Sequence, residues 1–166
     1  VVFVLVGTMM VYAADVKTNG NSVTIHPDDG QAKTVCLEVM GDRIIRVRAT
    51  SKEELPEKPA SLMIVPQKAP AKGSYTITEE GENIVVKTTG VKAVVRKSNG
   101  RVTFFDAKGK AMLKEAKGGK AFWDFTVPER ELGMKNGAAV EEQAKHGLSW
   151  RMLFDSPDNE ALYGLR

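Results

Sequence analysis

Turn residues recur at short intervals along this chain, and their spacing constrains the fold more than any other feature. Between residues 73 and 115 a turn signal returns about every 8–12 residues, as is typical of β-sandwiches. The turns are expected at Gly41, Gly81, Gly90, Gly100 and Gly109. Asn99 and Gly100 give the strongest signal, because both residue types accept the positive φ that tight hairpins require. The sequence therefore predicts an all-β fold, an antiparallel β-sandwich.

Runs of alternating apolar and polar residues lie between the turns and mark the strands. Strands are expected over residues 22–27, 34–40, 43–50, 61–66, 75–78, 83–88, 91–97, 101–106, 111–115 and 148–154, and a helix over 138–145. Alternation puts every second side chain on the same face of a strand. Val35, Leu37 and Val39 are therefore expected in the core. Trp150 is expected there too, on one face with Leu148 and Met152.

Residues 1–14 differ from the rest of the chain. They form an uncharged apolar run that ends in Ala13 and Ala14. Such a run is too short for a bilayer, which takes about 20 residues, and it matches the apolar part of a secretory signal. A buried first strand is the alternative. We expect residues 1–14 to be the remnant of a signal peptide, residues 15–166 to be the domain, and the protein to be periplasmic or secreted.

Charge and cysteine content exclude several classes of protein. The 24 basic and 21 acidic side chains give a net charge of +3 and are spread along the chain, whereas nucleic-acid binders concentrate their basic residues. The lysines between residues 108 and 120 alternate with Glu115 and glycines, which predicts a solvated face. The single cysteine, Cys36, forms no intrachain disulfide and is expected in the core. The sequence predicts neither a nucleic-acid partner nor a membrane span.

Residues suited to catalysis are few. We find no metal-ligand spacing, no phosphate-binding loop and no nucleophile motif. Most acidic residues lie in expected linkers and turns, where solvent keeps their chemistry ordinary. Trp123 lies in the densest aromatic cluster, residues 122–125, and is a candidate for stacking on a sugar, although such clusters more often fill a core. No catalytic residue, metal ligand or cofactor-binding residue is expected, and these patterns alone leave the function open.

Four segments carry a resemblance to a known family. Residues 155–165, with the sequence DSPDNEALYGL, resemble the segment that ends the amino-terminal domain of family 31 glycoside hydrolases, the α-glucosidases and α-xylosidases. Residues 42–47 (DRIIRV), 59–65 (PASLMIV) and 100–115 are similar to other strands of that domain. Arg166 stands where the family has a second glycine.

The resemblance implies a galactose-mutarotase-like sandwich that precedes a catalytic (β/α)8 barrel. It implies a retaining parent enzyme that hydrolyses α-linked glucosides or xylosides without a metal or organic cofactor. The catalytic aspartates of the family belong to the barrel, which is expected to be absent from this chain, so none is assigned here. The expected role is to support the barrel of the same full-length chain and to contribute to the rim that receives the carbohydrate. A free-standing carbohydrate-binding module and a structural interaction domain are the alternatives.

Overall fold

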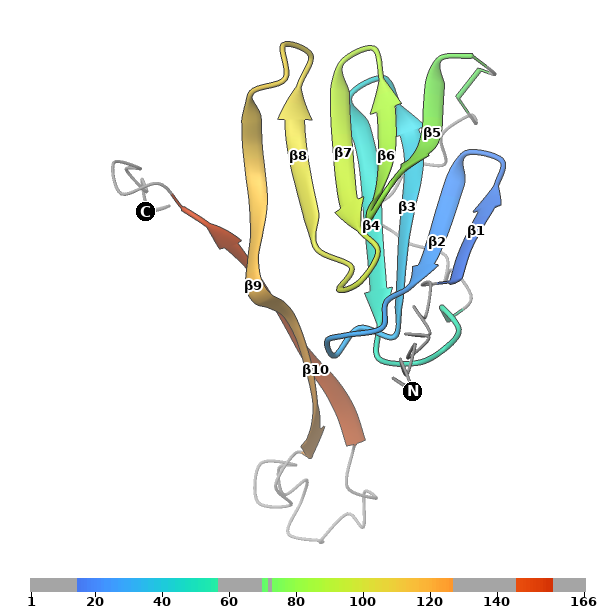
Figure 1. Cartoon of the computed structure of the whole chain (residues 1–166). Coiled ribbons are helices and arrows are strands. Elements are labelled where there is room, and N and C mark those ends of the chain that lie inside the picture. The colour runs from blue at the N-terminus through green and yellow to red at the C-terminus, as the bar shows by residue number, and fades with distance from the viewer. Residues whose placement is uncertain (1–14, 57–69, 72, 127–145, 157–166) are drawn as a thin grey trace, which may run out of the picture.

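The computed structural model describes residues 15–56, 70–71, 73–126 and 146–156, and the strands of this part form two antiparallel sheets (Figure 1). The four-stranded sheet has the order β1-β2-β3-β4 and the six-stranded sheet has the order β10-β9-β8-β7-β6-β5. The first contains β1 (Asp15–Asn19), β2 (Ser22–His26), β3 (Thr34–Gly41) and β4 (Ile44–Thr50). The second contains β5 (Tyr75–Glu80), β6 (Asn83–Thr88), β7 (Val91–Arg96), β8 (Val102–Asp106), β9 (Ala111–Thr126) and β10 (His146–Asp155).

The core lies between the two sheets and follows from the alternation in the sequence. Val35, Leu37 and Val39 of β3 are buried, as predicted, and they contact Ile84 and Val86 of the facing sheet as part of one cluster. Burying each such aliphatic side chain contributes roughly 1.5–3 kcal/mol. Alternate residues of these strands therefore supply the force that holds the sheets together. Cys36 is also buried, as predicted.

Hairpin turns help to fix how the sheets meet. The turn between β7 and β8 packs on the four-stranded sheet, where a Cβ on Gly100 would lie 2.8 Å from Cγ2 of Val35 and 2.9 Å from Cγ of Pro27. Gly100 also has a φ of +65°, so both space and backbone conformation require glycine here. At another turn the amide of Gly90 donates to the carbonyl oxygen of Asp42 over 3.1 Å.

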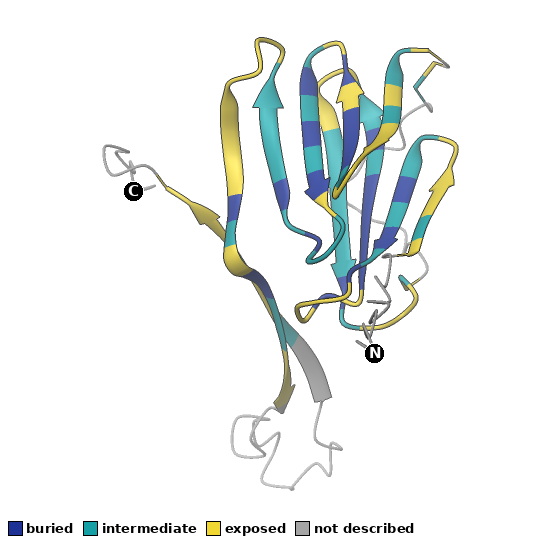
Figure 2. Ribbon diagram, viewed as in Figure 1, coloured by how far each residue is buried: buried dark blue, intermediate teal, exposed yellow. Residues whose placement is uncertain are grey.

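The sheets differ in width, and this leaves part of the larger sheet uncovered. Strand β3 packs on β6, and β4 packs on β7. Since β4 is the edge of its sheet, β9 and β10 extend past the smaller sheet (Figure 1). Below the sandwich in this view, β9 and β10 continue as a two-stranded hairpin, and Figure 2 shows exposed residues along much of its length.

Most of the expected strands within the described residues are confirmed to within one or two residues. Two differences stand out: β1 was not predicted, and β9 continues to Thr126, well beyond the expected end at residue 115. The expected signal segment (1–14), strand (61–66) and helix (138–145) lie outside the described residues. Within the part that is described, no helix is long and apolar enough to cross a membrane.

Candidate functional site

An apolar groove of about 580 Å³ lies where the six-stranded sheet continues past the edge of the smaller one. One wall is formed by β4 and the residues that follow it, including Val47, Ala49 and Leu55, and the other by β8, β9 and β10. Phe104, Phe122, Trp150 and Met152 line this second wall. We call it the open groove. It exists because β9 and β10 extend past β4, the edge strand of the smaller sheet.

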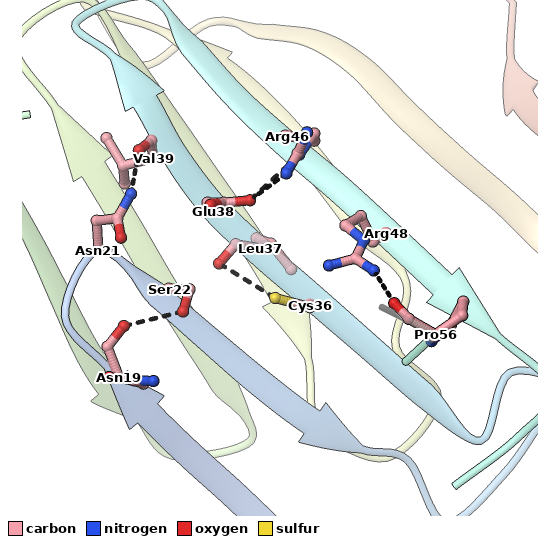
Figure 3. A network of polar contacts seen from close by, with 10 residues as sticks. All are labelled: Asn19, Asn21, Ser22, Cys36, Leu37, Glu38, Val39, Arg46, Arg48 and Pro56. Atoms are coloured by element: carbon pink, nitrogen blue, oxygen red, sulfur yellow. Dashed lines mark hydrogen bonds and ion pairs between the residues drawn. The ribbon is translucent and has the colours of Figure 1, made fainter. Parts of the chain in front are cut away.

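Polar contacts hold the wall beside β4 in place. Arg48 donates from Nη2 to the carbonyl oxygen of Pro56 over 2.7 Å, which fixes the chain after β4 along the margin of the groove (Figure 3). Thr34 adds a second contact, since its Oγ1 donates to the carbonyl oxygen of Glu53 over 2.7 Å. On the outer face of the sheet, Arg46 pairs with Glu38 at 2.7 Å (Figure 3). These contacts shape a wall without placing a reactive group in the groove.

A buried ion pair between Glu115 and Lys120 lines part of the groove. Oε2 of Glu115 accepts hydrogen bonds from Nζ of Lys120 and, over 3.1 Å, from the amide of Val102. Nζ of Lys120 also donates to the carbonyl oxygen of Gly100 over 2.8 Å. Nη2 of Arg101 donates to the carbonyl oxygen of Glu115 over 2.7 Å. The prediction that Lys120 lies on a solvated face is therefore wrong.

Burial lowers the pKa of the Lys120 ammonium below its ordinary value, because the protein interior solvates a charge less well than water does. The hydrogen bond and charge of Glu115 oppose this effect, and the nearby charge of Arg101 reinforces it. The ammonium and carboxylate thus satisfy each other in a site that would tolerate neither alone.

The open groove is suited to apolar contact and not to glycoside hydrolysis. Hydrolysis requires two carboxyl groups, about 5–5.5 Å apart for retention or about 6.5–9.5 Å for inversion. Among the described residues that line the groove, Glu115 is the only acid, and it is bonded to Lys120. No cluster of His, Cys, Asp or Glu in the described ranges has the arrangement of a metal site.

Trp123, the candidate for sugar stacking, does not line the groove. It alternates with Phe122 along β9 and so faces the other side of the hairpin, where it lies opposite Ser149 in the register. It is 48% exposed, and Phe125 on the same face is exposed to a similar extent. The expectation that residues 122–125 fill the core is therefore correct only for Phe122, which packs against the core cluster.

Trp150 is 68% exposed, so its predicted burial is wrong. It pairs with Phe122 across the hairpin, and both line the open groove with Met152. The alternation correctly placed Trp150 and Met152 on one face, but this face has no strand opposite it. Sequence reasoning also missed the Glu115–Lys120 pair. The signal that could have revealed it is Gly118–Gly119, because glycines inside a strand often mark a bulge.

The two sheets and the open groove define a class of protein, an antiparallel β-sandwich domain with one apolar side left open. Residues 34–165 match the glycosyl hydrolase 31 N-terminal galactose mutarotase-like domain. This chain belongs to that family, and the resemblance in its sequence is confirmed.

Solved structures agree with this assignment. The GH31 α-xylosidase from Xanthomonas citri is 34% identical over 90% of this chain, with a TM-score of 0.70. A GH31 α-xylosidase from a soil metagenome, solved with xylose, is 22% identical over 61% of the chain with a TM-score of 0.50. A Flavobacterium johnsoniae GH31 dextranase, solved with glucose, is 18% identical over 70% of the chain with a TM-score of 0.51. The last two support the fold alone.

The match covers only a small part of each relative. This chain spans 14% of the length of both α-xylosidases and 15% of the dextranase. In these proteins the matching segment is therefore one part of a much longer GH31 chain.

Proposed function

We propose that this chain serves as the non-catalytic amino-terminal sandwich of an α-xylosidase-like glycosidase, in which the rest of the enzyme covers the open groove. The observation that supports this role most directly is the groove itself. Most of the residues that line it are apolar, and Trp150 and Phe154 both lie on it with large exposed surfaces. Soluble domains seldom leave such a contiguous apolar surface in water unless another surface packs on it.

The substrate in this proposal comes from the relatives. The X. citri protein is an α-xylosidase, and the identity of 34% between it and this chain is the highest of the three structures compared. We therefore propose α-xylosides as the substrates of the parent enzyme, which would retain configuration at the anomeric carbon. Both catalytic carboxylates would come from a barrel, and the sandwich would contribute support and part of the rim around the bound sugar.

A chimeric enzyme tests this role. The segment of the X. citri α-xylosidase that matches residues 34–165 is replaced by the residues of this chain, and hydrolysis of a chromogenic α-xyloside is measured. We expect the chimera to be active and the 166-residue chain alone to be inactive. Turnover by the isolated chain that survives repurification, and that is lost on mutation of one of its acids, would overturn the proposal.

A matched pair of variants in the chimera tests whether the groove is the covered surface. Trp150→Asp places a charge in the groove, whereas Lys87→Asp changes an exposed residue of β6 that does not line it. We expect Trp150→Asp to lower the temperature at which activity is lost and Lys87→Asp to leave it unchanged. Equal effects of the two variants would argue against coverage of the groove.

A second candidate function is carbohydrate binding by the sandwich itself. The exposed rings of Trp123 and Phe125 share one face of β9, and their partners across the hairpin are the small residues Ser149 and Gly147. Rings left uncovered in this way can stack on sugar rings. Calorimetric titration of the chain with xylo- and gluco-oligosaccharides tests this. Carbohydrate binding by the sandwich would be favoured if Trp123→Ala abolished the binding and Trp150→Ala left it unchanged.

Export from the cytoplasm is a further part of the proposal, and it depends on the apolar run of residues 1–14. Amino-terminal sequencing of protein recovered from its natural host tests it. We expect the mature chain to begin near Ala14 or Asp15. A cytoplasmic protein that retains the apolar run would contradict export.

A further inference from the structure

Strand β9 contains a large bulge between Glu115 and Lys120. In the register with β10, Phe154 pairs with Glu115 and Met152 pairs with Lys120, so residues 116–119 lie opposite Leu153 alone. Before the bulge β9 pairs with both β8 and β10, and after it β9 pairs with β10. The bulge therefore marks the point where the six-stranded sheet ends and the projecting hairpin begins (Figure 1).

The ion pair closes this bulge. Glu115 is the last regular residue before it and Lys120 is the first after it, and the two charged groups contact each other across it. Both are also bonded to the sandwich, Glu115 through the amide of Val102 and Lys120 through the carbonyl oxygen of Gly100. The two sides of the bulge thus have fixed positions relative to β8 and the turn before it.

The packing of the bulge leaves little room for a different path. A Cβ on Gly119 would lie 2.7 Å from Cγ of Glu115 and 2.8 Å from the carbonyl oxygen of Leu153. Beyond the bulge, the amide of Phe122 donates to Oε1 of Gln31 over 2.7 Å. The start of the hairpin is therefore held by the ion pair on one side and by the loop after β2 on the other.

We propose that the Glu115–Lys120 pair sets the direction in which the β9–β10 hairpin leaves the sandwich and contributes little net stability. Replacing a buried ion pair by neutral groups of similar volume is often close to neutral for stability, whereas such pairs can fix register and geometry. The position of this pair at the point where the sheet becomes a hairpin matches the second role. The proposal concerns the fold and does not depend on the proposed enzymatic function.

The test compares hairpin direction with stability in the 166-residue chain. Spin labels are placed at Lys87→Cys in β6 and Asp124→Cys beyond the bulge, both exposed positions, in a Cys36→Ala background. The distribution of distances between the labels reports the direction of the hairpin. Glu115→Gln/Lys120→Met removes both charges and keeps a side-chain oxygen that can accept from Val102. The matched control is Lys114→Met/Asp155→Asn, which removes an exposed ion pair of 3.3 Å between β9 and β10.

At pH 7 we expect the Glu115→Gln/Lys120→Met variant to unfold at the same denaturant concentration as the parent and to show a broadened or shifted distance distribution. The control should change neither. A distribution identical to that of the parent would overturn the proposal.

Failure of the double variant to fold would overturn the statement about stability, and Glu115→Gln alone then tests the statement about direction. This variant removes the ion pair and keeps a side-chain oxygen that can accept from the amide of Val102. A broadened or shifted distribution in Glu115→Gln supports the role of the pair in setting direction, and an unchanged distribution contradicts it.

Discussion

The ammonium of Lys120 contacts the carboxylate of Glu115 at a place where the two side chains are only 5% and 2% exposed. The residues are five positions apart in one strand, a separation that would put them far from each other in a regular strand. The bulge of residues 116–119 brings them together. Two charges that would each be unstable in the protein interior thereby become partners.

Removing one partner should therefore be costly. Lys120→Met leaves the carboxylate of Glu115 buried without its cation, and we expect a loss of about 3–5 kcal/mol in the free energy of unfolding. Urea denaturation followed by circular dichroism measures it. Lys114→Met, which removes an exposed cation from the same strand, is the control and should cost less than about 1 kcal/mol. Similar losses in both variants would show that burial of the pair does not matter.

The lowered pKa of Lys120 predicts a pH dependence with a definite sign. The folded protein releases the Lys120 proton at a lower pH than the unfolded chain, whose lysine has the ordinary pKa of 10.5. Between these values the unfolded state binds more protons, so the free energy of unfolding rises with pH. In alkaline buffers we expect the free energy of unfolding of the parent to rise with pH relative to that of Glu115→Gln/Lys120→Met. Urea denaturation of both proteins measures this. The prediction would be contradicted if the difference in the free energy of unfolding between the parent and the variant stayed constant or fell as the pH increased.

Exposure of Trp150 predicts a small stability change. Trp150→Ala in the 166-residue chain should change the free energy of unfolding by less than about 1 kcal/mol, as substitutions at exposed sites do. Leu37→Ala, at a fully buried position, is the comparison and should cost about 2–5 kcal/mol. A loss for Trp150→Ala as large as that for Leu37→Ala would mean that the indole is part of the core.

Two turn glycines separate backbone strain from lack of space. Gly81 and Gly100 both have positive φ, of 57° and 65°. A Cβ on Gly81 would meet nothing within 4 Å, whereas one on Gly100 would run into Val35 and Pro27. We expect Gly81→Ala to cost about 1–2 kcal/mol from strain alone. Gly100→Ala should cost clearly more in the same thermal unfolding assay. Equal costs would indicate that the neighbouring sheet moves aside.

The sandwich could be predicted because its signals are local. Alternation in 34–40 and 83–88 identified strands whose alternate residues face the core, and Asn99 with Gly100 identified a hairpin. Each signal spans a few residues and does not depend on the rest of the fold. Strand β1 lacked such a signal, since most of its residues are exposed.

The candidate site could not be predicted because it depends on the relative width of the two sheets. Alternation puts Trp150 and Met152 on one face but does not show whether a strand lies opposite them. Likewise, the lysines between residues 108 and 120 look alike in sequence, and only the bulge separates Lys120, which is buried, from Lys114, which is exposed. The first error concerns segments that are distant in the sequence, and the second concerns a bulge within a single strand.

The strand orders have a consequence for how the domain acquires its structure. In both sheets every hydrogen-bonded neighbour is also the next strand along the chain, so each pairing closes only a short loop or a single connection. Low sequence separation between contacts favours rapid folding. During synthesis the hairpins can therefore form in order as the chain emerges from the ribosome. The association of β3 with β6 and of β4 with β7 joins segments that are distant in the sequence, so we expect it to be the slow step.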